Sequence, residues 1–235
     1  MDNKLNNSVA EQVQYIKNQA AQAAAACGRA PGEVQIMAVT KTVAPEYVNQ
    51  AIAAGITLLG ENRAQELLEK YDRYNKEGVS IHFIGHLQTN KVRQIIDKVD
   101  MIHSVGSLHL AQEIHRQAEK IGKVMPVLVE VNIGEEDSKS GIAPQQLMQL
   151  LEEMSKLSHI SVQGLMAIPP ICEKETENDQ YFCKMEQLFI DIKQKKLDNV
   201  NMNILSMGMS RDYQRAIQFG ANVVRLGTAI FGSRQ

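Results

Sequence analysis

The amino-acid sequence predicts a single-domain (β/α)8 barrel over residues 1–235, with an extra helix at its N-terminus. Three observations support this fold class. Short apolar segments of strand length alternate with longer segments of helical periodicity, as in parallel β/α folds. Eight such strands are separated by seven helices, the number that closes a barrel. Glycines stand at or just after the strand ends, where tight βα turns need them: Gly60, Gly85, Gly106, Gly134, Gly208 and Gly227.

The first element is an amphipathic helix over residues 8–28, whose apolar residues recur at helical spacing. Ser8 and Glu11 have the spacing of a capping box, and Gly28 stands where a C-terminal glycine belongs. The many alanines within 20–26 indicate that this helix packs closely on another surface.

Strands and helices then alternate to the end of the chain. We expect strands at 34–40, 57–60, 81–85, 101–104, 124–132, 161–167, 203–206 and 222–226. We expect helices at about 45–54, 62–75, 89–97, 107–121, 144–157, 175–196 and 210–219. An open, doubly wound sheet is the alternative arrangement of these elements. It is disfavoured because no G-x-G-x-x-G follows the first strand and no G-x-x-x-x-G-K-[ST] occurs.

The composition excludes several classes of protein. With 25 basic and 27 acidic residues the net charge is -2, which offers no basic excess for nucleic acid. The three cysteines form no C-x-x-C pair, and an odd number argues against a disulfide framework. The polar N-terminus does not resemble a signal peptide, and no apolar run approaches the roughly 20 residues that cross a bilayer. We therefore expect a cytoplasmic protein that binds neither nucleic acid nor membrane.

Lys41 follows the first predicted strand directly, at the end where β/α proteins build their active sites. A partly buried amine has a lowered pKa and can act as a nucleophile or form a Schiff base. The alternative is a lysine that extends from the strand end into water. Position alone leaves both interpretations open.

Two loops near the C-terminus, L-S-M-G-M-S-R-D (205–212) and R-L-G-T-A-I-F-G (225–232), follow the seventh and eighth strands. These loops are the usual phosphate site of the barrel. They offer hydroxyl groups and flexible backbone for an anion: Ser206, Ser210, Thr228, Gly208 and Gly227. The alternative is that Ser210 only caps a helix and that the glycines only turn the chain. The presence of both loops favours a phosphate site.

Arg225 closes the last strand and should point into the mouth of the barrel. It pairs there either with a carboxylate such as Glu130 or with a ligand. Together with Lys41 and the phosphate loops, it suits an aldehyde-bearing phosphate cofactor, whose pyridine nitrogen an arginine can face in pyridoxal phosphate enzymes.

Other polar residues give weaker signals. Asn62 follows the second strand, and the local pattern alone favours a helix N-cap over a ligand contact. His82 and His86 flank the third strand, but no further ligand completes a zinc set, so we expect no metal there. Met207 and its neighbour Met209 are candidates for the mouth, and Lys139 is a second amine on a polar loop.

Seven motifs together resemble the pyridoxal 5′-phosphate (PLP) homeostasis proteins over about residues 8–234. They are A-V-T-K-T (38–42), G-E-N-R-A-Q-E (60–66), H-F-I-G-H-L-Q-T-N-K (82–91), S-K-S-G (138–141), G-L-M-A-I (164–168), L-S-M-G-M-S (205–210) and R-L-G-T-A-I-F-G (225–232). The resemblance implies a barrel similar to the N-terminal domain of bacterial alanine racemase. It implies further that such a protein buffers or delivers PLP and influences amino-acid and keto-acid balance.

The resemblance also assigns roles to residues of this chain. It implies that Lys41 holds PLP as a Schiff base and that Arg225 faces the pyridine nitrogen. Lys139 matches a family lysine with a secondary or transfer role. The remaining contacts that it implies are to the phosphate, from Ser206, Ser210, Gly227 and Thr228, and to the ring, from Asn62 and Met207.

The sequence favours a carrier over an enzyme. Racemases of the related fold add a second domain that supplies a tyrosine acid/base, whereas this sequence ends at Gln235, soon after the last strand. An arginine at the pyridine nitrogen also makes the ring a weaker electron sink. We expect a monomer that hands PLP to PLP-dependent apoenzymes. The alternatives are a single-domain racemase using Lys41 alone, and a Schiff-base aldolase acting on a phosphorylated sugar.

Overall fold

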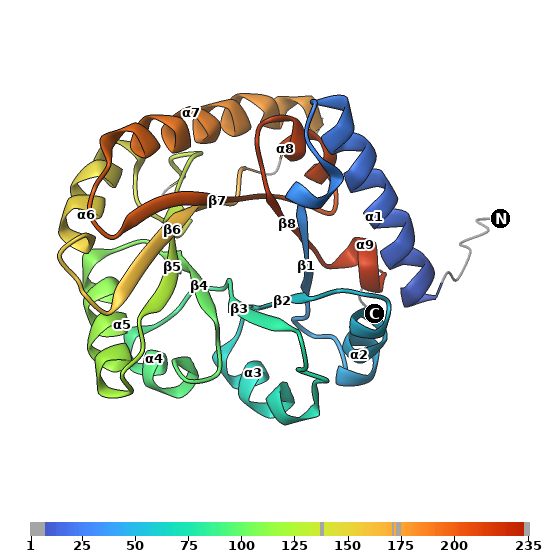
Figure 1. Cartoon of the computed structure of the whole chain (residues 1–235), viewed down its shortest axis with the longest axis horizontal. Helices are drawn as coiled ribbons and strands as arrows, with labels where there is room; N and C mark the ends of the chain where they lie inside the picture. The colour runs from blue at the N-terminus through green and yellow to red at the C-terminus, as the bar shows by residue number, and fades with distance from the viewer. Residues whose placement is uncertain (1–7, 137–138, 171, 173–174, 233–235) are drawn as a thin grey trace.

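The computed structural model, which describes residues 8–136, 139–170, 172 and 175–232, confirms the closed barrel. Eight parallel strands follow in sequence order, and β1 pairs with both β2 and β8 (Figure 1). The open sheet is therefore wrong. The strands are β1 Gln35–Val39, β2 Leu58–Glu61, β3 Ser80–Phe83, β4 Met101–Val105, β5 Met125–Val131, β6 Ile160–Ala167, β7 Val200–Met209 and β8 Val223–Leu226.

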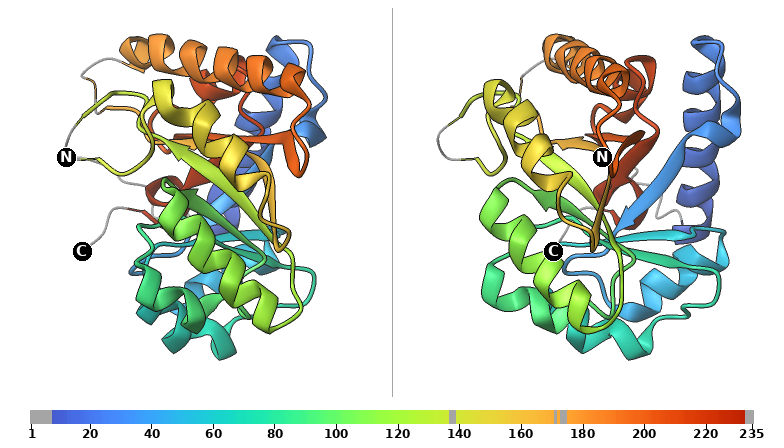
Figure 2. Two further views of the ribbon diagram at one scale, coloured as in Figure 1. Left: turned by 90° about the vertical axis from the view of Figure 1, so that its left-hand side faces the viewer. Right: turned by 60° about the vertical axis from the view of Figure 1, so that its left-hand side comes forward.

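The helices lie outside the ring of strands, as the side views show (Figure 2). They are α1 Val9–Ala26, α2 Pro45–Ala53, α3 Ala64–Lys70, α4 Thr89–Ile95, α5 Leu108–Lys120, α6 Leu147–Met154, α7 Asp179–Lys195, α8 Tyr213–Gln218 and α9 Thr228–Phe231. Short 3-10 turns are η1 Pro31–Glu33, η2 Tyr71–Arg73, η3 Pro144–Gln146 and η4 Glu175–Asn178. Within the described ranges, no helix is long and apolar enough to cross a membrane.

The N-terminal helix is confirmed and takes the place of an outer barrel helix. Ser8 and Glu11 form both hydrogen bonds of the capping box. The buried face of α1 contacts α2, α8 and α9, so it covers the seam between β8 and β1. The single turn of α9 is too short to cover that seam alone, and the small side chains of Ala20 and Ala24 let α1 approach closely.

The largest apolar cluster lies between the strands and the helices, and the barrel interior is divided into an apolar and a polar part. Met37, Leu58 and Leu128 belong to the apolar interior. Paired residues of parallel strands face the same side of the sheet. Arg225 pairs with Met37, Ser206 with Met166, and His82 with Met101, which places buried polar side chains inside the barrel.

The seventh strand differs most from its prediction of 203–206, because it extends through Met209. The register between β7 and β8 shifts between Ser206 and Met209, and Gly208 has a φ of 89°. This bulge lets the ladder resume beyond the glycine, and α8 starts later than the expected residue 210. The cysteines Cys27, Cys172 and Cys183 are free thiols, as expected.

Candidate functional site

A cavity of about 320 Å³ opens at the carboxyl ends of the strands. It joins residues that end or follow β1, β2, β3, β6, β7 and β8, with two more from the segment before α7. The lining residues are Val39, Lys41, Asn62, Ile84, Ile168, Pro170, Cys172, Asn178, Met209, Ser210, Arg211, Asp212, Arg225, Gly227 and Thr228. Lys41, Arg225 and the two C-terminal loops therefore meet in one place, as the sequence predicts.

Lys41 is half-buried in the turn after β1, and the backbone on both sides of it is anchored. Thr40 donates its backbone N–H to the carbonyl of Gly60 at 3.0 Å. Thr42 adopts a left-handed φ of 60°, which is unfavourable for a β-branched residue, and its N–H donates to the Glu66 carboxylate at 2.7 Å. The surrounding contacts thus determine the direction in which the Lys41 side chain leaves the strand.

The buried carboxylate of Glu61 stabilises this turn through Thr40. Glu61 accepts hydrogen bonds from the hydroxyls of Thr40 and Tyr74, both at 2.7 Å, and its carboxylate lies 3.7 Å from the Lys70 amine. Lys70 in turn donates to the carbonyl of Thr40 at 3.1 Å and to Glu66 at 2.9 Å. Burial and the charge of Glu61 raise the pKa of Tyr74, so its hydroxyl stays a donor. Glu61 and Glu66 of the G-E-N-R-A-Q-E motif therefore position Lys41.

Asn62 lines the cavity, and its interpretation as a helix N-cap is wrong. Helix α3 starts at Ala64, and its N-cap residue is Arg63, which makes no side-chain capping bond. The Asn62 Oδ1 atom is buried without a hydrogen-bond partner. A Cβ on Gly85 would lie 1.9 Å from the Asn62 carbonyl oxygen, so only glycine allows this approach of the two loops. Asn62 thus brings a buried acceptor without a partner to the cavity wall, which suits a ligand that donates hydrogen bonds.

The two C-terminal loops contact each other directly. The Ser210 hydroxyl accepts a hydrogen bond at 3.2 Å from the backbone N–H of Ala229, in the first turn of α9. Ser210 is therefore not the N-cap of α8, which starts at Tyr213 with Asp212 in the capping position. Ser210, Gly227 and Thr228 share the cavity wall and provide hydroxyl and backbone groups for an anion.

Gly208 serves packing rather than anion binding. It does not line the cavity, and a Cβ on it would lie 2.5 Å from the Cβ of Ala216 in α8. The glycine therefore lets β7 and α8 pack closely at the bulge.

Arg225 is almost fully buried and presents its guanidinium at the cavity. It donates to the Ser206 hydroxyl at 2.7 Å and to the Ala167 carbonyl at 2.8 Å. Burial lowers its pKa to about 10, against the attraction of Glu130 and Asp212, so it remains a cation at neutral pH. Among the described residues Arg225 forms no close ion pair with Glu130. These two hydrogen bonds hold its guanidinium in place instead.

Two predicted contacts do not reach the cavity surface. Ser206 is fully buried inside the barrel and bonds to Arg225. Met207 belongs to the apolar cluster between strands and helices, because successive strand residues face opposite sides. Because the bulge at Gly208 interrupts the alternation, the side chain of Met209 points into the barrel and lines the cavity in place of Met207.

The histidines of the third strand are separated by the structure. His82 lies inside the barrel and shares a 2.9 Å hydrogen bond with His103. Burial lowers the pKa of His82 to about 4, and burial together with His82 and Arg225 holds the pKa of His103 well below its usual value. Both rings are therefore neutral at pH 7. His86 instead bonds to Ser140 and lines a second cavity of about 540 Å³.

Lys139 does not line the cavity. Its amine forms an ion pair with Glu136 at 2.5 Å and donates to the Pro169 carbonyl at 3.2 Å. It therefore contacts the loop after β6, whose residues Ile168 and Pro170 line the cavity wall. Asp137 and Ser138, which precede Lys139 in the loop after β5, lie outside the described residues.

The sequence did not indicate Asn178 or Asp212. Asn178 is buried at the start of α7, donates to Asp212 at 2.8 Å, and leaves its Oδ1 atom buried without a partner. Asp212 also accepts the backbone N–H of Met209 at 2.7 Å. No local pattern reveals these residues, because their contact joins segments 34 positions apart.

Glu130 provides a pH-dependent prediction. Burial raises its pKa from 4.5 to about 7, although Arg225 opposes this. The folded protein therefore retains a proton that the unfolded chain releases, and Glu130 lowers the free energy of unfolding as pH rises through this window. We therefore expect the free energy of unfolding of Glu130→Gln, relative to that of the original protein, to rise by about 1–3 kcal/mol as pH increases from 4.5 to 8.

Urea unfolding of both proteins across this pH range measures the difference. The depressed histidine pKa values have the opposite effect on stability, but they are present in both proteins and cancel in the comparison. Parallel pH profiles would show that Glu130 has no raised pKa.

The cavity as a whole combines a lysine amine, a buried cation and an anion-binding wall. An amine can bond covalently to a carbonyl carbon, and hydroxyl groups, backbone N–H groups and a guanidinium are donors that can bind an anion and a ring or carbonyl acceptor. The arrangement therefore suits a small phosphorylated aldehyde.

Comparison with known proteins agrees with this geometry. Residues 12–235 match the family model of the alanine racemase N-terminal domain. A pyridoxal phosphate homeostasis protein of Aquifex aeolicus is 41% identical over 208 residues, covering 88% of this chain and 90% of that protein. PipY of Synechococcus elongatus, solved with PLP bound, is 30% identical with a TM-score of 0.84, covering 95% of this chain and all of that one. An unknown protein from Bifidobacterium adolescentis is 33% identical with a TM-score of 0.90, covering 98% of this chain and 97% of that one.

Proposed function

Since this chain belongs to the pyridoxal phosphate homeostasis protein family, within the alanine racemase N-terminal domain fold, we propose that it binds PLP in the barrel cavity and takes part in PLP homeostasis. One observation carries the proposal: the Lys41 amine and the loop pair of Ser210 and Thr228 open on the same cavity. Such a cavity offers a covalent anchor and a phosphate site at once.

The residues present fit the cofactor. Bound PLP supplies an aldehyde that forms a Schiff base with an amine, and Lys41 is the one lysine among the described lining residues. Ser210, Gly227 and Thr228 would hold the phosphate. Arg225 would face the ring nitrogen, fixed in direction by its bonds to Ser206 and Ala167.

The orphaned oxygen atoms suit the rest of the ligand. Asn62 and Asn178 each have a buried Oδ1 atom without a partner, and both side chains line the cavity. We propose that Asn62 accepts a hydrogen bond from a protonated group near the ring. Ser206 acts through Arg225 in this proposal, and Met209 takes the ring-side position that the family resemblance implied for Met207.

We propose further that the protein is a carrier rather than a catalyst. Two-sided proton transfer needs a second acid or base besides the lysine. Among the described lining residues there is no tyrosine or histidine, the one carboxylate, Asp212, is held by Asn178 and Met209, and the Cys172 thiol donates to the Pro170 carbonyl at 3.7 Å. Arg225, a cation with a pKa of about 10, does not give up a full proton to the ring nitrogen. Release of PLP to apoenzymes by a cytoplasmic monomer completes the proposal.

The absorbance spectrum of the purified protein tests this proposal. We expect a yellow band that stays with the protein after incubation with PLP and removal of the unbound PLP by gel filtration, and we expect borohydride to bleach it by reducing the Schiff base. Mixing with amino acids should produce no steady turnover. A protein that stays colourless with added PLP contradicts binding, whereas steady racemisation of an added amino acid contradicts the carrier role alone.

A further inference from the structure

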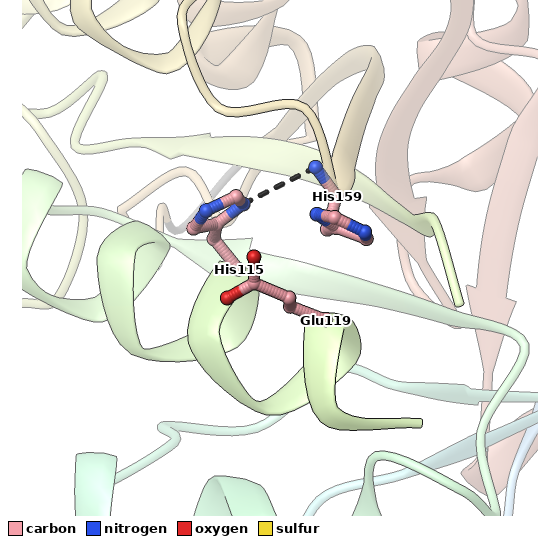
Figure 3. A group of neighbouring side chains, drawn as sticks. All are labelled: His115, Glu119 and His159. Carbon is pink, nitrogen blue, oxygen red and sulfur yellow. Dashed lines mark hydrogen bonds between the residues drawn. The ribbon is translucent and has the colours of Figure 1, made fainter. Parts of the chain in front are cut away.

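Three potential metal ligands meet on the outside of the barrel, away from both cavities (Figure 3). His115 and Glu119 are one helical turn apart on α5, and the i, i+4 spacing places them on one face. His159 comes from the turn between α6 and β6. One ligand atom from each residue lies within 4.8 Å of the other two.

A backbone hydrogen bond orients the first of these side chains. The N–H of His159 donates to Nδ1 of His115 at 3.2 Å, shown as the dashed line in Figure 3. Because a backbone N–H can only donate, this hydrogen bond occupies the single lone pair of Nδ1, and the neutral ring carries its proton on Nε2. The two imidazole rings are 5.3 Å apart between centroids. Coordination of an ion through Nδ1 would therefore replace this hydrogen bond, while Nε2 kept its proton.

Exposure allows the group to close around an ion. His115 and His159 are half-buried, and Glu119 is exposed. In a tetrahedral site, ligands at about 2.0–2.2 Å from the ion lie about 3.3–3.6 Å apart, so these side chains must draw together by up to about 1.5 Å. Glu119 has the most room to move of the three because it stands on the solvent side of α5.

We propose that His115, Glu119 and His159 bind one divalent transition-metal ion, with Zn²⁺ as the favoured ion. Two imidazoles and one carboxylate are ligands that Zn²⁺ accepts, and water takes the fourth position. Mg²⁺ and Ca²⁺ prefer oxygen ligands only and are not expected to bind here. The ion would join α5 to the start of β6, two elements that are distant in sequence, and would stabilise the folded chain.

Calorimetric titration of the full chain, first stripped of metal with a chelator, tests the site. We expect saturable binding of one Zn²⁺ per chain, a rise in the thermal unfolding midpoint with Zn²⁺, and neither effect with Mg²⁺. His115→Ala, His159→Ala and Glu119→Gln should each weaken Zn²⁺ binding by about tenfold or more, since even outer-shell changes weaken metal sites by that factor.

His109→Ala is the matched control, because His109 is an exposed histidine on the same helix outside the cluster. It should retain the Zn²⁺ affinity of the original protein. Glu119→Gln changes only an exposed side chain, so its result remains interpretable even if a histidine variant fails to fold. The proposal would be overturned if the original protein showed no saturable Zn²⁺ binding. It would also be overturned if Glu119→Gln and either histidine variant kept the original Zn²⁺ affinity, or if His109→Ala lost as much affinity as the cluster variants.

Discussion

Lys41→Ala should abolish the Schiff base with PLP, so that borohydride no longer fixes PLP to the protein. It should also lower PLP affinity by at least about tenfold, a loss of about 1.4 kcal/mol in binding free energy. The reason is geometric. Lys41 is the one lysine on the described cavity wall, and the anchored residues Thr40 and Thr42 direct it. Absorbance before and after borohydride, followed by peptide mapping of the reduced adduct, measures the effect. Residual binding is expected, because the Ser210 side of the cavity is intact.

Two variants serve as controls for Lys41. Lys41→Arg keeps the positive charge but cannot form a Schiff base, so it should lose the attachment as completely as Lys41→Ala. Lys139→Ala should keep the attachment at Lys41, because Lys139 pairs with Glu136 outside the cavity wall. A reduced adduct that maps to Lys139 in the original protein would contradict the assignment of the anchor.

Glu61→Ala should strongly destabilise the folded protein. It removes the acceptor of the Thr40 and Tyr74 hydroxyls, both at 2.7 Å, and a fully buried charge beside Lys70. Breaking a buried pair from one side costs about 3–5 kcal/mol, and we expect about 3 kcal/mol because Lys70 keeps its bond to Glu66. Urea unfolding measures this loss of stability, and weaker PLP binding should accompany it because the Lys41 turn loses its support.

Glu69→Ala is the matched control for Glu61, since Glu69 is an exposed glutamate on the neighbouring helix α3. Its effect on the free energy of unfolding should stay within about 0.5 kcal/mol. If Glu61→Ala lost no more stability than Glu69→Ala, the buried network would not support the turn.

The sequence predicted correctly that Lys41 and the two C-terminal loops lie close together, because their proximity follows from strand order. In a closed parallel barrel every strand ends at the same rim, so Lys41 after β1 and Ser210 after β7 must approach one another. The same reasoning failed for Met207. The prediction ended the seventh strand at residue 206, whereas the strand continues, so Met207 alternates outward after the inward Ser206. The bulge that then turns Met209 inward depends on the register against β8.

Local patterns were least informative where a side chain bonds to a distant segment. Asn62 resembles an N-cap in sequence, but its backbone packs closely on Gly85 of the next loop, α3 starts two residues later, and Asn62 lines the cavity. The contact of Asn178 with Asp212, and the approach of His159 to His115 and Glu119, have no local signal because each depends on the packing of separate elements.

The sequence by itself determined the fold class, the order of the strands, the covering N-terminal helix and the rim on which the site lies. These features follow from periodicity, capping residues and glycine positions, which act within a few residues of the chain. Only the tertiary structure decided which side chains reach the cavity and which support it. Ser206 supports Arg225, and Glu61 supports the Lys41 turn through Thr40. Both contacts join buried side chains from strands that are separated in sequence, so they depend on the register between those strands.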